Sequence, residues 1–137
     1  MSTLSQMEQL FKAMADRNRL RILAALQGGP LCVCQLMGVL GLSQSTVSKH
    51  LAILKEAGLL LEEQRGKRTY YSLSEEFASP SVRGVVNAVL NGLKDSPELA
   101  EDQRLAEFMR EFRIETVEAA LNVRKKRSLL RVLQADS

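Results

Sequence analysis

The stretch LCVCQLMGVLGLSQSTVSKHLAILKEAGLL, residues 31–60, decides the fold, because it holds two short helical patterns around a glycine corner. Its first part has apolar residues at positions i, i+3, i+4 and i+7, namely Val33, Leu36, Met37 and Leu40. This spacing predicts a short helix that begins at or just after the two cysteines and ends at Gly41. Ser43 is a good N-cap for a second helix, which ends at Gly58. Two short helices joined in this way indicate a helix-turn-helix.

Two strand patterns follow the second helix directly. They cover residues 59–63 and 68–73, and the second is rich in β-branched and aromatic residues. The segment Arg65-Gly66-Lys67 joins them, which predicts a β-hairpin. The expected fold class is therefore mainly α with a small β-hairpin, a winged helix-turn-helix.

Helical patterns flank this core on both sides. Before it, residues 6–27 predict two helices with a break near Asp16 and Asn18. After it, Ser79 and Pro80 form the cap and first turn of an amphipathic helix, and further helical pattern runs from about Leu99. The apolar stripes of this C-terminal part include Val82, Val85, Val86, Val89, Leu105, Phe108, Phe112, Val117, Leu121, Leu129, Leu130 and Leu133. So much apolar surface outside a small core predicts a homodimer with the terminal helices at its interface.

Length and composition limit the class of protein. With 137 residues, of which 45% are hydrophobic and 26% charged, the chain is expected to form a single domain over residues 1–137 with its core at about residues 10–75. No apolar run approaches the roughly 20 residues that a membrane-spanning helix needs. The first residues also lack the pattern of a secretory signal. We therefore expect a cytoplasmic protein without a membrane partner.

The second helix of the pair has two different faces. Val47, Leu51 and Leu54 share one face and are expected to anchor the helix. The remaining surface offers small polar and basic side chains that can approach base edges or phosphates of double-stranded DNA. The candidate DNA-binding residues are Gln44, Ser45, Thr46, Ser48, Lys49 and His50 on the helix, with Arg65, Lys67 and Arg68 at the hairpin.

Each of these features also has a plainer explanation. A polar stripe is often only a solvated helix face, and a charged hairpin tip protects a sheet edge from aggregation. His50, the single histidine, fits either a phosphate contact or a partly buried packing role. The combination of helix and basic hairpin is what favours DNA binding.

Cys32 and Cys34 are the two cysteines of the chain, and one residue separates them. In a regular helix they would point to nearly opposite sides, and a disulfide between them would close a strained, very small loop. They are expected to be reduced thiols, and such thiols can serve as buried core residues or as a redox switch. An enzyme is not expected, because the βαβ pattern of thioredoxin-like active sites is missing.

The stretch quoted above, followed by the hairpin sequence EEQRGKRTYYSLS, closely resembles the ArsR/SmtB family of metal- and metalloid-responsive repressors. The resemblance covers roughly residues 10–73. It implies a winged-helix homodimer that binds an inverted-repeat operator and leaves it when an inducer binds. Cys32 and Cys34 match the Cys-Val-Cys signature of the branch that senses arsenic and antimony, which some cadmium and lead sensors share.

Two positions depart from that branch. Arsenic sensors of the family often have aspartate and then a third cysteine where this chain has Gln35 and Met37. The resemblance thus implies a two-thiol site for trivalent arsenic or antimony, as arsenite or an organoarsenical, with no cofactor required. For both sulfurs to hold one atom, the first helical turn is expected to leave helical geometry. The alternative function is a thiol redox-sensing or non-metal-responsive winged-helix repressor.

Overall fold

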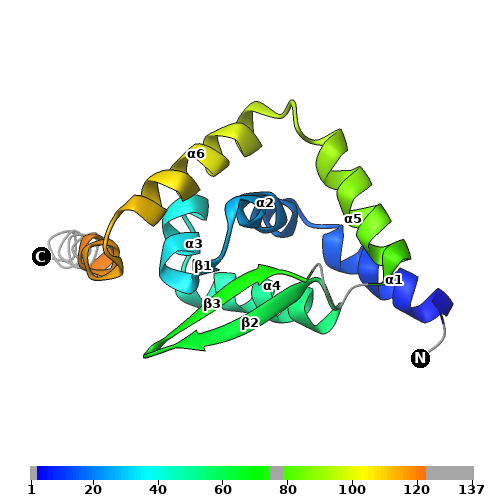
Figure 1. Cartoon of the computed structure of the whole chain (residues 1–137), viewed down its shortest axis with the longest axis horizontal. Coiled ribbons are helices and arrows are strands. Elements are labelled where there is room, and N and C mark those ends of the chain that lie inside the picture. The colour runs from blue at the N-terminus through cyan, green and yellow to red at the C-terminus, as the bar shows by residue number, and fades with distance from the viewer. Residues whose placement is uncertain (1–2, 75–78, 123–137) are drawn as a thin grey trace, which may run out of the picture.

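The computed structural model describes residues 3–74 and 79–122, and the chain in it is mainly helical (Figure 1). The first half contains α1 (Thr3–Met14), α2 (Arg17–Ala25), a 3-10 turn η1 (Leu26–Gly28), β1 (Leu31–Cys32), α3 (Val33–Leu40) and α4 (Gln44–Glu56). The second half contains β2 (Leu60–Arg65), β3 (Arg68–Leu73), α5 (Pro80–Gly92) and α6 (Pro97–Glu111). Residues 114–122 are helical too and are called helix 114–122 below. Leu129, Leu130 and Leu133 lie outside the described residues.

The predicted helix ends carry local signals that the structure confirms. Asp16 caps α2 by accepting the backbone N–H groups of Asn18 and Arg19 at 2.9 and 3.1 Å. Gly41 closes α3 in the left-handed conformation, with φ of 69°, which glycine adopts without steric cost. Ser43 then accepts the N–H of Thr46 at 3.3 Å and starts α4. These caps position α4 against α3 as the helix-turn-helix pattern predicts.

The sheet has three strands, one more than the sequence predicts. β2 and β3 form the expected hairpin, although β2 covers residues 60–65 instead of 59–63. β1 pairs with the other edge of β3, with Leu31 opposite Tyr71 and Cys32 opposite Tyr70. Two residues are too few to show an alternating pattern, so β1 has no signal of its own in the sequence.

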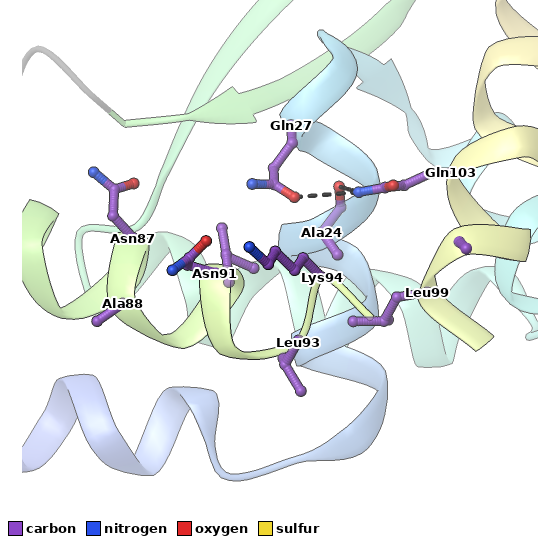
Figure 2. Close-up of a pocket in the computed structure, with 11 residues that line it drawn as sticks. Ala24, Gln27, Asn87, Ala88, Asn91, Leu93, Lys94, Leu99 and Gln103 are labelled. Carbon is purple, nitrogen blue, oxygen red and sulfur yellow. Dashed lines mark hydrogen bonds between the residues drawn. The ribbon is translucent and has the colours of Figure 1, made fainter. Parts of the chain in front are cut away.

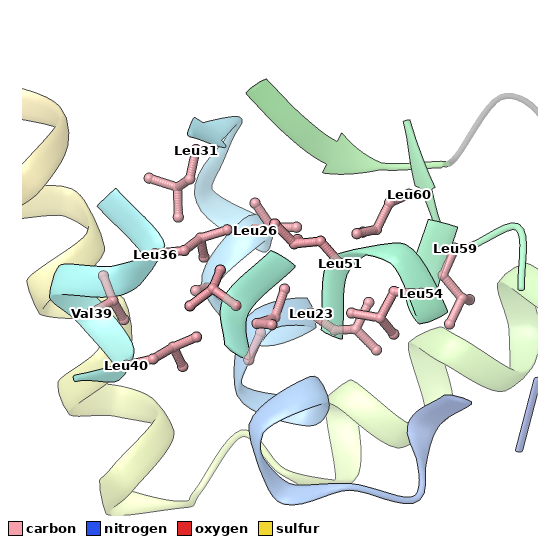
Figure 3. Close-up of a cluster of buried hydrophobic side chains, with 14 of the residues drawn as sticks. Leu23, Leu26, Leu31, Leu36, Val39, Leu40, Leu51, Leu54, Leu59 and Leu60 are labelled. Atoms are coloured by element: carbon pink, nitrogen blue, oxygen red, sulfur yellow. The ribbon is translucent and has the colours of Figure 1, made fainter. Parts of the chain in front are cut away.

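The core lies among the helices α1 to α4, and Leu31 and Leu60 of the sheet complete it on one side (Figure 3). The anchoring face of α4 is buried as predicted, since Val47, Leu51 and Leu54 are at most 1% exposed. They meet large apolar side chains of the neighbouring elements, Leu10, Ile22, Leu23, Leu31 and Leu36. Burying a side chain of this size stabilises the fold by about 1.5–3 kcal/mol. The core therefore holds α4 rigidly and leaves its polar face outside.

The C-terminal part of the chain folds back over this core. Figure 1 shows α5 and α6 as an arch on the side of α2 away from the hairpin. Arg21 of α2 donates to both carboxylate oxygens of the buried Asp102 of α6, at 2.8 and 3.0 Å. Arg110 donates to the carbonyl oxygens of Ala25 and Gly29. These bonds satisfy the end of α2 and fix α6 beside α3, so part of the C-terminal apolar stripe is buried within the chain itself.

Apolar surface remains on α1 and α5. Leu4 and Phe11 of α1 are exposed, and the four valines of α5 that face one side are only half-buried. None of the helices in the described part of the chain is both long and apolar enough to cross a membrane.

Candidate functional site

The exposed face of α4 is polar and basic. Gln44, Ser45, Ser48 and Lys49 are all exposed on it. Lys49 forms no ion pair with any residue that the structure describes, so its charge is available to an outside anion. Thr46 differs, because it is half-buried and its hydroxyl lies 2.9 Å from that of Ser43 within the helix cap. These four predicted residues thus share one exposed surface, on which the Ser45 hydroxyl lies 3.3 Å from that of Ser43.

His50 lies at the edge of this face and points toward the corner between α1 and α2. Its side chain is 13% exposed, with Nδ1 3.3 Å from a guanidinium nitrogen of Arg19 and 4.0 Å from a carboxylate oxygen of Asp16. Of the two roles that the sequence allows, this geometry favours packing over a phosphate contact.

The three predicted cations of the hairpin do not all point the same way. Arg65 and Lys67 are exposed on either side of Gly66, where the turn needs a positive φ of 61°. Arg65 donates to Glu63 at 3.1 Å, and its guanidinium carbon lies 4.7 Å from the ring centre of Tyr70. Arg68 turns the other way: its side chain is 26% exposed and its Nε donates to Glu118. Two cations, not three, are therefore presented beside α4.

The cysteines lie at the junction between β1 and α3. Cys32 ends the strand, has extended backbone with φ of −89° and ψ of 170°, and is 2% exposed. Cys34 is in the first turn of α3 and is half-buried. Both are free thiols. Cys32 is already outside helical geometry, whereas Cys34 lies within α3, and the expected departure of the first turn from helical geometry on inducer binding stays a prediction.

Gln35 connects this junction to α6. Its side-chain oxygen accepts the backbone N–H of Cys32 at 3.0 Å, and its side-chain nitrogen donates to the carbonyl oxygen of Met109 at 3.5 Å. Gln35 is buried, and its bond to Cys32 is shielded from water, while its bond to Met109 is partly buried. The residue found where related sensors often have aspartate thus holds the backbone at the first cysteine.

Glu118 of helix 114–122 joins the second cysteine to the hairpin. The Sγ of Cys34 donates to its Oε1 at 3.9 Å, and Arg68 donates to the same oxygen. Burial raises the pKa of the Cys34 thiol, and the charges of Cys32 and Glu118 raise it further. The bond from Arg68 lowers the pKa of Glu118. Sequence reasoning missed Glu118, because no local pattern marks a contact between residues 84 positions apart.

At this junction, the two cysteine thiols are the candidate ligands for a metal or metalloid. Within the described ranges, no three or more His, Cys, Asp or Glu side chains are placed to hold a metal ion. Two thiols, once deprotonated, are soft donors that suit a thiophilic atom and not a hard oxygen-seeking cation. The donor set fits a two-sulfur complex with trivalent arsenic or antimony.

A large polar pocket of about 560 Å³ lies elsewhere, under the arch of α5 and α6 (Figure 2). Gln103 of α6 reaches across it to the carbonyl oxygen of Ala24 and the side chain of Gln27, at 3.4 and 3.2 Å. Neither cysteine and no residue of α4 lines this pocket. It is therefore separate from both candidate surfaces.

Known proteins share the sequence pattern of these surfaces. Residues 16–62 match the family described as bacterial regulatory protein, arsR family. The chain is 42% identical over 103 residues to the arsenic resistance transcriptional regulator ArsR1 of Pseudomonas putida, covering 72% of this chain and 77% of that one. It is 51% identical over 67 residues to the arsenical resistance operon repressor of Escherichia coli, covering 48% of this chain and 57% of that one.

Solved structures share the fold. HlyU from Vibrio cholerae superposes with a TM-score of 0.59 at 33% identity, covering 69% of this chain and all of that one. A homodimeric winged helix-turn-helix DNA-binding domain from Mycobacterium bovis, a possible ArsR-family regulator, gives a TM-score of 0.57 at 28% identity, covering 69% of this chain and 83% of that one. The matched regulators are DNA-binding proteins and not enzymes. The chain therefore belongs to the arsR family of bacterial regulatory proteins and is a DNA-binding transcriptional repressor.

Proposed function

We propose that the protein binds an inverted-repeat DNA operator as a homodimer and is released by trivalent arsenic or antimony, as arsenite or an organoarsenical, captured by Cys32 and Cys34. The observation that carries this proposal is the position of the two free thiols, at the junction between a strand of the hairpin sheet and the helix that precedes α4. The names of the arsenical resistance regulators in Pseudomonas putida and Escherichia coli support the class of inducer.

On the DNA side, the exposed residues of α4 enter the major groove. Gln44 and Ser45 lead at the N-terminus of the helix, and Ser48 and Lys49 follow one turn later. Arg65 and Lys67 contact the phosphate backbone from the hairpin. Thr46 and His50 mainly stabilise the fold and do not contact DNA. Thr46 belongs to the helix cap, and His50 packs on Asp16 and Arg19.

On the inducer side, each thiol exchanges with one hydroxyl of arsenite. Two As–O bonds break, two As–S bonds form, and the two thiol protons leave with the hydroxyls as two molecules of water. Arsenic stays trivalent and keeps its third hydroxyl, so no oxidant or reductant is needed. Met37 is not required as a third ligand and remains a packing residue of α3.

Binding of arsenic by both sulfurs displaces two elements at once, strand β1 and helix α3. Cys32 is paired with Tyr70 of β3, so a shift of its backbone reaches the hairpin. Cys34 lies in α3, which packs on α4. A coupling free energy of about 1–3 kcal/mol, typical of allosteric proteins, would lower operator affinity by about 5–150-fold.

A second copy of the chain is needed to read both halves of an inverted repeat. The exposed Leu4 and Phe11 of α1 supply apolar surface for it, next to the α5 valines that are only half-buried against the core.

The test is release from DNA. A labelled duplex that the reduced protein selects from a random library is titrated to a complex, and arsenite or antimonite is added while anisotropy is followed. Release is expected for the wild type and not for Cys32→Ser or Cys34→Ser, which should still bind the duplex. Release of the wild type by peroxide alone, with no effect of arsenite or antimonite, would replace the proposal with a thiol redox switch.

A further inference from the structure

An apolar hollow of about 210 Å³ lies between α3, α6 and helix 114–122. Its walls are mainly aliphatic and aromatic, with Thr116 as the one polar lining residue in the described part of the chain, and they include Gly38, Phe108, Met109, Phe112, Val117 and Ala120. The rings of Phe108 and Phe112 meet edge to face with their centres 4.7 Å apart, and both side chains are exposed. The hollow thus has one open aromatic side and one closed side against α3.

Cys34 does not line the hollow, but it lies one helical turn before Gly38, which does. Gly38 and Cys34 are four residues apart in α3, which places them on the same face about 6 Å apart along the axis. On the opposite wall, Val117 lines the hollow while its neighbour Glu118 accepts a hydrogen bond from Cys34. A group attached to an atom on the Cys34 sulfur can therefore extend along α3 into the hollow.

Gly38 allows α6 to pack closely against α3 at the wall of the hollow. A Cβ at this position would lie 2.5 Å from the terminal methyl carbon of Met109, closer than real contacts allow. Because Gly38 has no side chain, the Met109 thioether lies directly on α3 and closes the hollow with a soft, polarisable group. Size and lining both suit a flat apolar ring, since a cavity of about 150 Å³ lined by aliphatic and aromatic side chains already holds benzene.

We propose that this hollow receives the organic substituent of an arylarsenic(III) inducer whose arsenic is held by Cys32 and Cys34. The inference rests on the proposed function and names a preferred inducer class. Phenylarsenite carries two hydroxyls, and both are exchanged for sulfur. Two As–O bonds break, two As–S bonds form, two molecules of water leave, and the As–C bond and the trivalent state are unchanged. The phenyl ring then packs between α3 and the Phe108–Phe112 pair.

The test compares two phenylalanine substitutions one residue apart. Ala120→Phe fills the hollow, whereas the matched control Ala119→Phe adds the same ring at an exposed position that does not line it. Release from the operator duplex is titrated with arsenite, methylarsenite and phenylarsenite for both variants and the wild type. Dimer content is measured in parallel by sedimentation.

The wild type should respond to phenylarsenite at lower concentration than to arsenite. In Ala120→Phe the phenylarsenite concentration that releases half of the DNA should rise at least about tenfold, because the phenyl ring can no longer be buried in the hollow. The corresponding arsenite concentration should stay unchanged, and that for methylarsenite should rise by an intermediate amount. Ala119→Phe should behave as wild type. As a second variant, Phe112→Ala removes an aromatic wall and should weaken only the phenylarsenite response.

Other outcomes separate the possible failures. If arsenite and phenylarsenite release the wild type but Ala120→Phe leaves both responses unchanged, or shifts them equally, the ring does not occupy the hollow, while the proposed function stands. If Ala120→Phe instead changes the dimer content without this discrimination, the hollow is an interface between copies of the chain and the inference is overturned. If no arsenical releases the wild type, the proposed function itself fails.

Discussion

The DNA-facing part of the molecule and the cysteine junction are built in opposite ways. α4 is specified by neighbouring residues, with a serine cap, a glycine corner and an apolar face that alternates with a polar one. The cysteine junction is assembled from distant segments, because Gln35 reaches Met109 and Cys34 reaches Glu118, 74 and 84 positions away. A surface that reads DNA can be placed by local rules, whereas a surface that senses an inducer depends on what folds over it.

Arg68 belongs to both parts. It follows the hairpin turn, where two other cations face outward, but its own guanidinium is bound to Glu118, which also accepts from Cys34. The tip of the hairpin is therefore tied to the cysteine junction by one carboxylate. This makes Arg68 and Lys67 a useful pair for separating the two parts by mutation.

The largest expected effect comes from releasing α6, which carries the Met109 carbonyl that Gln35 of the cysteine junction contacts. Asp102→Ala leaves Arg21 without its buried partner and should lower the free energy of unfolding by about 3–5 kcal/mol, measured by urea denaturation. Glu98→Ala, also on α6, removes a largely exposed contact with Arg17 of α2 and a longer one of 3.5 Å with Arg21, and should cost much less. Equal losses would show that the Arg21–Asp102 pair does not hold α6 in place.

The second-largest expected effect distinguishes lysines on the proposed DNA-facing surface from a lysine elsewhere on the molecule. Lys49→Ala and Lys67→Ala should each weaken operator binding and lower the slope of log affinity against log salt concentration by about 2, because each removes one phosphate contact from both subunits of the dimer. Lys94→Ala removes an exposed lysine from the far side of the molecule, beside the polar pocket, and should leave both values unchanged. The same loss for Lys94→Ala would mean that α4 and the hairpin are not the DNA-facing surface.

A smaller effect is expected one residue further along the hairpin. Arg68→Ala should keep the salt slope of the wild type, since its charge is already paired with Glu118, but should shift the arsenite concentration that releases DNA. Both quantities come from the same anisotropy titrations at several salt concentrations. A salt slope that falls as it does in Lys67→Ala would place Arg68 on the DNA instead.

The smallest effect concerns the rate of thiol reaction. Because burial and the neighbouring negative charges raise the pKa of Cys34, its thiol is mostly protonated at neutral pH and its alkylation rate should rise about tenfold per pH unit between pH 6 and 8. Glu118→Gln removes one of these charges and frees Arg68, so its Cys34 should react faster at each pH. Iodoacetamide labelling followed by mass spectrometry measures this rate. An unchanged rate would show that Glu118 does not act on the thiol.

The limits of sequence reasoning follow the same division. Caps, corners and periodicity predicted α2, α3, α4, the hairpin and α5, because those signals act over a few residues. The sequence did not predict β1, since two residues show no period, nor that Cys32 is in a strand when helical spacing begins at Val33. Arg68 looked like its neighbours at the hairpin tip, and only the fold of helix 114–122 distinguishes it. Contacts that close the sensing site depend on tertiary packing, which no local pattern records.

The most direct test counts arsenic and DNA in the same sample. Reduced protein bound to its operator duplex is titrated with arsenite, and arsenic per chain is measured by native mass spectrometry alongside the fraction of DNA still bound. The account predicts that DNA is released as one arsenic binds per chain, and that the Cys32→Ser, Cys34→Ser double variant binds none and stays on the duplex. Release of the double variant by arsenite, or a wild type that carries one arsenic per chain and remains bound to DNA, would contradict it.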